Sequence, residues 1–259
     1  MQARHQQGAP HIGSGSPGWT ASPALPHVLQ RWGLRLPLPA RGPVGPQLAE
    51  ALSWRDAVAL AQVLKTPSAE PAPDAAHRRL AAREWAEAAR ERLVAELQAG
   101  FADPVLVQDG PEAPARAAQG LEAVAPFKLH HSSQQRSMAA RMATLRGRLR
   151  TQLAGTTPRL ARLAQLDAVF EPAWAAREQP ALAGLPSMTV QRGLRLQAAA
   201  PEAAQDARAW PPTGWRGQLW TELQDVLHAE LALRLQPVLG LIEALQHDDP
   251  CGPIRIETP

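Results

Sequence analysis

The residue types that most often carry chemistry are few and scattered in this chain. His130 and His131 form the only pair of adjacent histidines, and Cys251 is the only cysteine. Neighbouring residues on a helix point about 100° apart, and no cysteine or carboxylate stands near the two histidines at the spacing of metal ligands. No partner that would activate the Cys251 thiol can be named. We therefore expect no metal, no cofactor and no catalytic residue.

The sequence also lacks the short motifs of common catalytic folds. It contains no Gly-x-Ser-x-Gly, no phosphate-binding loop and no dinucleotide fingerprint. The glycine-rich stretch GSGSPG, residues 13–18, lies in a segment of low complexity and not between a strand and a helix. A non-catalytic protein is the resulting expectation.

The clearest electrostatic feature is a segment without acidic residues, 123–166. It contains these candidate contacts to an anionic partner: Lys128, Arg136, Arg141, Arg146, Arg148, Arg150, Arg159 and Arg162. One hypothesis is a basic face for nucleic acid or an anionic membrane surface. The alternative is that these cations face water or the protein's own acidic helices. The arginines spread over both sides of an apolar seam, and no aromatic residues alternate with them, which favours the alternative. The seam consists of Met138, Met142, Leu145, Leu149 and Leu153.

The second candidate is the segment HAELALRLQPVLGLIEAL, residues 228–245. Its spacing is that of a long amphipathic helix, which we interpret as a docking helix. The residues that define it are Leu227, Glu230, Leu231, Arg234, Leu235, Pro237 and Ile242. Glu230 and Arg234 have the favourable order for an intrahelical ion pair, which we place at the water-exposed margin of the leucine seam. Pro237 predicts a kink near Leu233.

The elements that position these residues are all expected to be helices. The periodicities predict helices over 46–64, 74–101, 134–153, 158–174 and 215–245, with a weaker signal over 181–196. Residues 102–125 are expected to form a linker. Four tryptophans fall on or beside apolar faces and are predicted to anchor the core: Trp54, Trp85, Trp174 and Trp220. No alternating pattern suggests a strand, so the predicted fold is an all-α, irregular bundle of about five helices with Pro-rich linkers.

Composition divides the chain into three parts. Residues 1–45 are predicted to be a disordered Gly/Pro/Ser-rich arm, 46–246 a helical domain and 247–259 a flexible tail. A subdivision of the domain into 46–101 and 127–246 stays open. No secretory signal or membrane-spanning run is found, and a single cysteine fits a reducing compartment, so a cytoplasmic protein is expected.

Three segments resemble an uncharacterised proteobacterial family, the domain of unknown function numbered 3348. They are WRDAVAL at 54–60, LRGRLRTQLAGTTPRLARLAQLDAVF at 145–170 and AELALRLQPVLGLIEAL at 229–245. The resemblance covers roughly residues 46–245 and implies a helical architecture without an assigned activity. Ala232, Leu239 and Pro180 depart from the family's pattern. Members are encoded beside proteins resembling proton-channel subunits, which implies an accessory to an envelope complex.

Two functional hypotheses follow. The first is a non-catalytic helical adaptor in the cytoplasm that binds protein partners, with a membrane complex as one candidate partner. The alternative is a nucleic-acid-binding protein that uses the acid-free segment 123–166. Self-association is left open.

Overall fold

The computed structural model describes residues 25–33, 52–66, 73–103, 120–200 and 214–248, and within these ranges it is helical, with no strand. The all-α prediction is therefore confirmed. The helices are α1 (Leu25–Arg31), α3 (Trp54–Lys65), α4 (Ala75–Ala102), α6 (Leu121–Ala154), α7 (Pro158–Ala183), α8 (Leu185–Ala199) and α9 (Gly214–His247). Most of the predicted tail, arm and linker lie outside the described residues, but of the predicted tail His247 ends α9 and Asp248 is buried.

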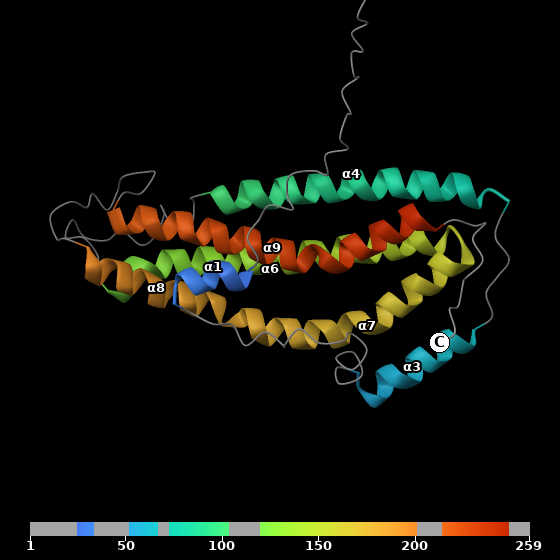
Figure 1. Ribbon diagram of the computed structural model, residues 1–259, viewed down its shortest axis with the longest axis horizontal. Helices are drawn as coiled ribbons and strands as arrows, with labels where there is room; N and C mark the ends of the chain where they lie inside the picture. Colours follow the sequence, from blue (N-terminus) through green and yellow to red (C-terminus); the bar gives the residue numbers. More distant parts are fainter. Residues whose placement is uncertain (1–24, 34–51, 67–72, 104–119, 201–213, 249–259) are drawn as a thin grey trace, which may run out of the picture.

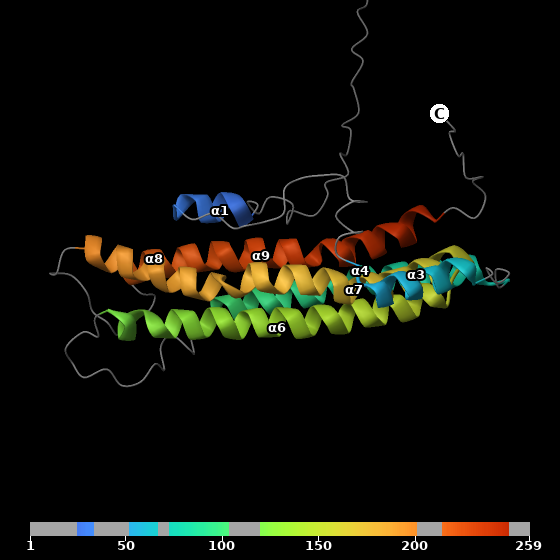
Figure 2. The same cartoon turned by 90° about the horizontal axis from the view of Figure 1, so that it is seen from below.

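The long helices lie side by side and form an elongated bundle (Figures 1 and 2). Helix α6 contacts α4, α7, α8 and α9, and α9 also contacts α4 and α8. With 34 residues each, α6 and α9 are about 50 Å long. Helices α6 and α9 therefore hold the bundle together along its whole length.

The core follows the apolar stripes of these two helices. In α6 the predicted seam is confirmed, since Met138, Leu149 and Leu153 are fully buried and Met142 and Leu145 nearly so. The leucines of α9 complete the same cluster: Leu219, Leu223, Leu227, Leu231, Leu235, Leu241 and Leu245. Repeats at three and four residues place such side chains on one face of a helix, which explains why the sequence located this core correctly.

Helix α6 begins earlier than predicted. The linker expected over 102–125 ends at Gly120, whose φ of +64° favours glycine, and the helix starts at Leu121. Val124 and Phe127 are fully buried in the main core. Pro126 and a polar run interrupt the helical pattern here, so the sequence did not predict this first part of α6. The burial of Val124 and Phe127 in the assembled bundle stabilises it.

Prolines inside the other helices do not end them. Helix α7 continues through Pro172 and Pro180 to Ala183, and α8 follows after Gly184 alone. Helix α9 passes through Pro237 without a break, and its C-terminal part tilts away from the line of its first part (Figure 2). The tilt agrees with the bend that proline imposes on a helix.

Two short helices lie on the outside of the bundle. Helix α1 packs on α9 and buries Leu25, Val28, Leu29 and Trp32, so the prediction of a disordered arm is wrong for residues 25–33. The apolar side chains of this segment pack on a small apolar surface formed by α7, α8 and α9. The composition of the arm gave no indication of this packing. Helix α3 packs on α7 beside the first turns of that helix (Figure 1).

Candidate functional site

The carboxylate of Glu230 lies inside the bundle, fully buried, and not at its margin. Arg234 donates to Glu230 Oε1 from Nε at 2.9 Å and from Nη2 at 2.8 Å, so the predicted intrahelical pair exists. Its predicted exposure to water is wrong. The Glu230 carboxylate contacts His131 and Gln135 of α6, and a helix pattern alone does not tell how many neighbours surround a helix.

A second acidic residue completes the charge balance of this cluster. Arg234 Nη1 lies 3.0 Å from Glu178 Oε1 on α7, and both side chains are largely buried. Burial raises the pKa of Glu178 above its ordinary value, against the attraction of Arg234. Burial also acts to raise the pKa of Glu230, but hydrogen bonding from His131 and the charge of Arg234 hold that pKa below its ordinary value.

His131 connects Glu230 to α8. Its Nε2 lies 3.4 Å from Glu230 Oε2, and its Nδ1 lies 2.8 Å from the hydroxyl of Thr189, which also lies 3.2 Å from the carbonyl of Leu185. With Nε2–H donating to the carboxylate, Nδ1 of a neutral ring accepts from the Thr189 hydroxyl. In a protonated ring, Nδ1–H would donate to that hydroxyl, which would then donate to the carbonyl of Leu185.

Gln135 completes the cluster, since its amide donates to Glu230 Oε2 at 3.1 Å and to the carbonyl of Leu182 at 3.0 Å. Among the described residues, no buried side-chain nitrogen or oxygen lacks a hydrogen-bond partner. Nor does any group of three or more His, Cys, Asp or Glu side chains in these ranges have the arrangement of a metal site. The cluster therefore joins α6, α7, α8 and α9, and we assign it a positioning role.

The two adjacent histidines point to different neighbours. His130 Nε2 lies 3.1 Å from the carbonyl of Phe101 at the end of α4, and its ring lies 5.1 Å from that of Trp220. Burial lowers the pKa of His130 below its ordinary value, which favours the neutral ring. Sequence reasoning missed the carboxylate beside His131 because Glu230 is 99 residues away along the chain.

The basic segment is divided by internal ion pairs. Arg146 makes a bidentate contact to Asp167 at 2.6 and 2.8 Å, and Arg150 lies 3.1 Å from Asp167 and 2.5 Å from Glu171. All four side chains are largely buried between α6 and α7. These two arginines, which are among the eight cations of the nucleic-acid hypothesis, therefore face the protein's own acidic residues.

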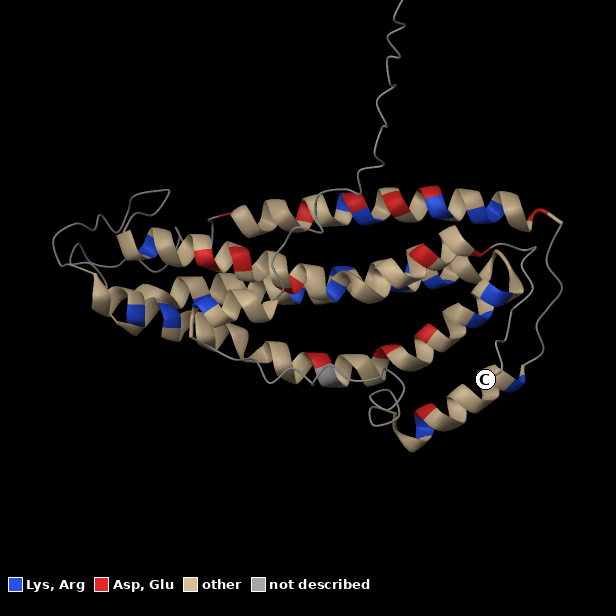
Figure 3. Cartoon of the chain, in the orientation of Figure 1, with Lys and Arg blue, Asp and Glu red and all other residues tan. Residues whose placement is uncertain are grey.

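The other cations of the segment are spread around the bundle (Figure 3). Arg141 pairs with Glu96 on α4, Arg159 lies near Asp248 and Arg162 donates to the carbonyl of Thr66. Three more are exposed: Lys128, Arg136 and Arg148. Figure 3 shows acidic and basic residues interleaved along α4, so the charges do not gather on one face there.

A family model described as "Protein of unknown function (DUF3348)" matches residues 18–247. The chain belongs to this family. The match begins before α1, at a position well before residue 46, so the family includes the segment that packs on α9. No curated protein and no solved structure gave a match.

The apolar residues of α9, the predicted docking helix of this DUF3348 chain, are used inside the molecule. Leu227, Leu231, Leu235 and Ile242 are all buried in the main core. Pro237 is half-buried. The apolar side of α9 is therefore covered by the chain's own helices.

Two of the tryptophans predicted to anchor the core lie on the surface instead. Trp54 is 83% exposed and Trp174 is 40% exposed, whereas Trp85 and Trp220 are half-buried against the core as predicted. Trp54 begins α3, a helix in which no residue is buried. The sequence showed that α3 is apolar on several sides, but not which side the bundle covers.

The side of α3 turned to α7 is formed by Ala59, Leu60 and Val63, which are half-buried. The opposite side, which we call the α3 outer face, is exposed and consists of Trp54, Ala57, Val58, Ala61 and, at its flank, Leu64. Arg55, Gln62 and Lys65 are also exposed on α3, so polar side chains adjoin this apolar face. The α3 outer face thus exposes large apolar side chains to water, Trp54 most of all at 83%.

Proposed function

We propose that this DUF3348 protein is a non-catalytic helical module that binds another protein through the α3 outer face. The observation that supports this proposal is the exposure of Trp54, at 83%, together with Val58 at 40% and Leu64 at 57% on the same short helix. Contiguous apolar patches on a surface mark binding sites far more often than single exposed residues do. Tryptophan is also among the residues that contribute most to protein interfaces.

The local structure of α3 supports this role, since the helix is stable before a partner arrives. Ser53 and Asp56 form a capping box, in which the Ser53 hydroxyl accepts from the Asp56 amide and Asp56 accepts from the Ser53 amide. The other end is held by the hydrogen bond from Arg162 to Thr66. A helix fixed at both ends loses little conformational entropy when it binds.

The place of action is part of the proposal. No described helix is long and apolar enough to cross a membrane. We place the protein in the cytoplasm, where the family resemblance implies an accessory role beside an envelope complex of the proton-channel kind. Nucleic-acid binding has less support, since Arg146 and Arg150 are paired internally.

The test is capture of partners by the tagged full-length protein from its own cells, side by side with Trp54→Glu. The expected result is that the wild type retains a reproducible set of proteins and that Trp54→Glu loses at least one of them. Leu129→Ser is the matched control, since Leu129 is 59% exposed on α6. It removes an exposed apolar residue elsewhere and should retain every partner.

A photoreactive residue placed at Ala61 then identifies which retained protein contacts α3. The proposal fails if no protein is captured reproducibly, or if the captured proteins are the same for the wild type and Trp54→Glu. Binding of DNA or RNA that weakens steeply with salt, and that Arg148→Gln reduces, would favour the nucleic-acid alternative instead.

A further inference from the structure

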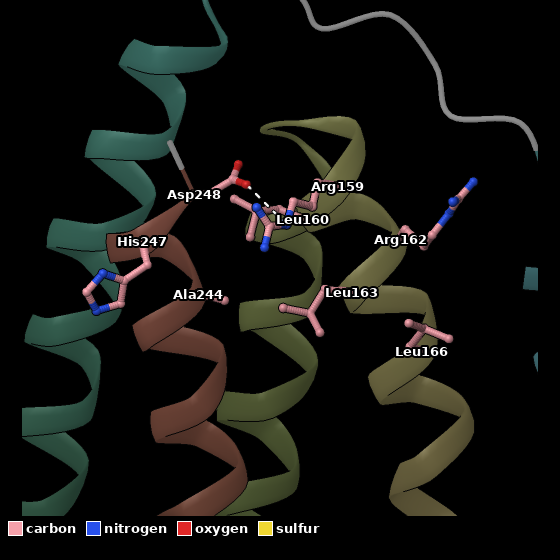
Figure 4. A pocket seen from close by; sticks show the side chains of 8 residues that line it. All are labelled: Arg159, Leu160, Arg162, Leu163, Leu166, Ala244, His247 and Asp248. Atoms are coloured by element: carbon pink, nitrogen blue, oxygen red, sulfur yellow. Dashed lines mark ion pairs between the residues drawn. The ribbon is translucent and has the colours of Figure 1, made fainter. Parts of the chain in front are cut away.

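An apolar pocket with a volume of about 310 Å³ lies between the start of α7 and the end of α9 (Figure 4). The cations at its edge have partners within the chain. Arg159 faces Asp248, which also lines the pocket, with Nε 3.8 Å from Oδ1, and Arg162 donates to the carbonyl of Thr66. The C-terminal end of α9, the negative end of its helix dipole, lies at the same pocket. Opposite charges thus balance around the pocket, and we assign it no ligand.

The surface that α1 covers is different, because the chemistry that fits it is visible. Leu25, Val28, Leu29 and Trp32 are each at most 3% exposed. They stand at positions i, i+3, i+4 and i+7, which is the spacing by which an amphipathic helix of one protein binds to an apolar surface of another. His27, on the opposite side of α1, is exposed. Helix α1 therefore packs on the outside of the bundle as a bound helical peptide packs on its receptor (Figure 2).

The surface under α1, which we call the α1 docking surface, is a cluster separate from the main core. It consists of Leu182, Leu185, Val226 and Ala229, with the half-buried Met188 and Leu233 packed against them. None of these six side chains belongs to the main core cluster. The α1 segment can thus leave without opening that core, and its departure would expose a contiguous apolar surface.

Polar contacts at the C-terminal end of α1 make this surface selective. Arg195 of α8 donates from Nη1 to the carbonyl of Trp32 at 3.1 Å, and Arg31 pairs with Asp225 of α9 at 2.8 Å. The other acid that Arg31 influences, Glu222, is already held by a bidentate contact from α8. A helix on this surface therefore gains from a basic residue one position before its last apolar anchor.

Helix α1 has little local support of its own. It has seven residues, and isolated helices shorter than about 12 residues are marginal in water. Ordering them costs conformational entropy, which is offset by four buried apolar side chains, one hydrogen bond and one exposed ion pair. Segments with so few contacts open more readily than a core does. Opening of α1 alone therefore costs less free energy than opening of the main core.

We propose that the α1 docking surface binds an amphipathic helix of a protein partner and that α1 competes with this helix in cis. The partner helix has large apolar residues at i, i+3, i+4 and i+7 and a basic residue at i+6, opposite Asp225. An α1 segment from a second copy gains no contact over the tethered one, whose effective concentration is high. A longer partner helix does gain, because it is more stable as a helix. The inference is independent of the proposed function, since the α3 outer face is not part of this surface.

The first test measures binding of a fluorescein-labelled peptide of residues 22–34 to the full-length protein by fluorescence anisotropy. Leu29→Glu in the protein removes α1 from the surface, because it places a charge at a fully buried position. His27→Glu places the same charge on the exposed side of α1 and is the matched control. The peptide should bind Leu29→Glu about tenfold more tightly than it binds the wild type or His27→Glu. Equal binding to all three proteins, or binding to none, overturns the inference.

A charge exchange tests whether the peptide binds in the place of α1. Asp225→Lys, added to Leu29→Glu, should weaken binding of the peptide about threefold. A peptide with Arg31→Glu should regain the lost affinity on this protein. Both side chains are exposed in the pair, so the changes have little effect on folding, which circular dichroism and thermal melting check. Affinity that responds to neither change would show unspecific adhesion and contradict the assignment.

The partner's chemistry is tested with a random peptide library displayed on phage, selected on Leu29→Glu with counter-selection on the wild type. Enriched peptides should carry the four apolar residues at this spacing and the basic residue at i+6, and peptides without this pattern would refute the proposal. Light scattering adds a second check, since a wild-type dimer that Leu29→Glu converts to a monomer would make a second copy the occupant and overturn the assignment to a partner. Trp54→Glu should leave peptide binding unchanged, so failure here does not affect the proposed role of α3.

Discussion

Among single residues, Glu230 lies in an environment that its local sequence did not predict. Its i,i+4 partner Arg234 is visible in the sequence, and an exposed pair of this kind contributes only a few tenths of a kcal/mol. In the structure the carboxylate is fully buried and contacts His131, Gln135 and Arg234. Removing the charge of Glu230 leaves Arg234 with Glu178 and weakens the buried contacts of His131 and Gln135, which costs more than losing an exposed pair.

We therefore expect Glu230→Gln to destabilise the protein by about 3 kcal/mol. Leu231→Ala, which creates a cavity in the core beside the same helix, should destabilise the protein by about 2–5 kcal/mol. Glu243→Gln is the control, since Glu243 is exposed on the same helix, and it should change stability by less than about 0.5 kcal/mol. Urea unfolding of the purified variants at neutral pH measures all three. A Glu230→Gln midpoint equal to that of Glu243→Gln would show that the carboxylate is not held in the cluster.

At the scale of the helices, the approach of α8 to its neighbours depends on Gly193. A Cβ atom at this position would lie 2.6 Å from Val124 Cγ1 on α6 and 2.8 Å from Leu219 Cδ2 on α9. These distances are too short for carbon atoms, so the three helices come together where a side chain is missing. Gly240, inside α9, has open space around the same position.

Gly193→Ala should consequently destabilise the protein by about 1–3 kcal/mol, because the methyl group forces α8 away from α6 and α9. Gly240→Ala should stabilise it by up to about 1 kcal/mol, because alanine favours the helix and meets no neighbour. Thermal melts of the two variants decide this, and opposite signs of the change in Tm are the expected result. A neutral Gly193→Ala would mean that the contact among α6, α8 and α9 is looser than described.

At the scale of the whole molecule, ion pairs between helices make stability depend on pH. The pKa of Glu222 is held below its ordinary value by two hydrogen bonds from Arg192, although burial acts to raise it. The pKa of Glu230 is lowered as well, whereas burial raises the pKa of Glu178. Glu222 and Glu230 therefore add stability above their ordinary pKa of 4.5, and Glu178 does so below it.

From these signs we expect the free energy of unfolding to fall as the pH is lowered below 4.5, where Glu222 and Glu230 become protonated. Glu178 acts in the opposite direction, and its stabilising contribution is lost as the pH rises above 4.5. Urea unfolding between about pH 3 and pH 7 measures the dependence. Glu230→Gln should flatten the acid side, and Glu178→Gln should remove a decline on the neutral side. An acid side that Glu230→Gln leaves unchanged would exclude the buried carboxylate as its source.

The helical class and the main core could be predicted from the spacing of residues along the chain. Repeats at three and four residues are local, so they identified Met138, Leu149 and Leu231 as core residues without any knowledge of the neighbours of their helices. The order of Glu230 and Arg234 likewise determined their pairing, because both lie on one helix.

Which sides of each helix are covered could not be predicted in this way, because it depends on how the helices pack. Trp54 and Leu231 both lie in apolar helical patterns, yet one is 83% exposed and the other 3%. The contacts of His131 with Glu230 and of Arg146 with Asp167 join residues distant in the chain. Burial and pairing of this kind depend on how many helices surround a position, and the local spacing of residues contains no information about that number.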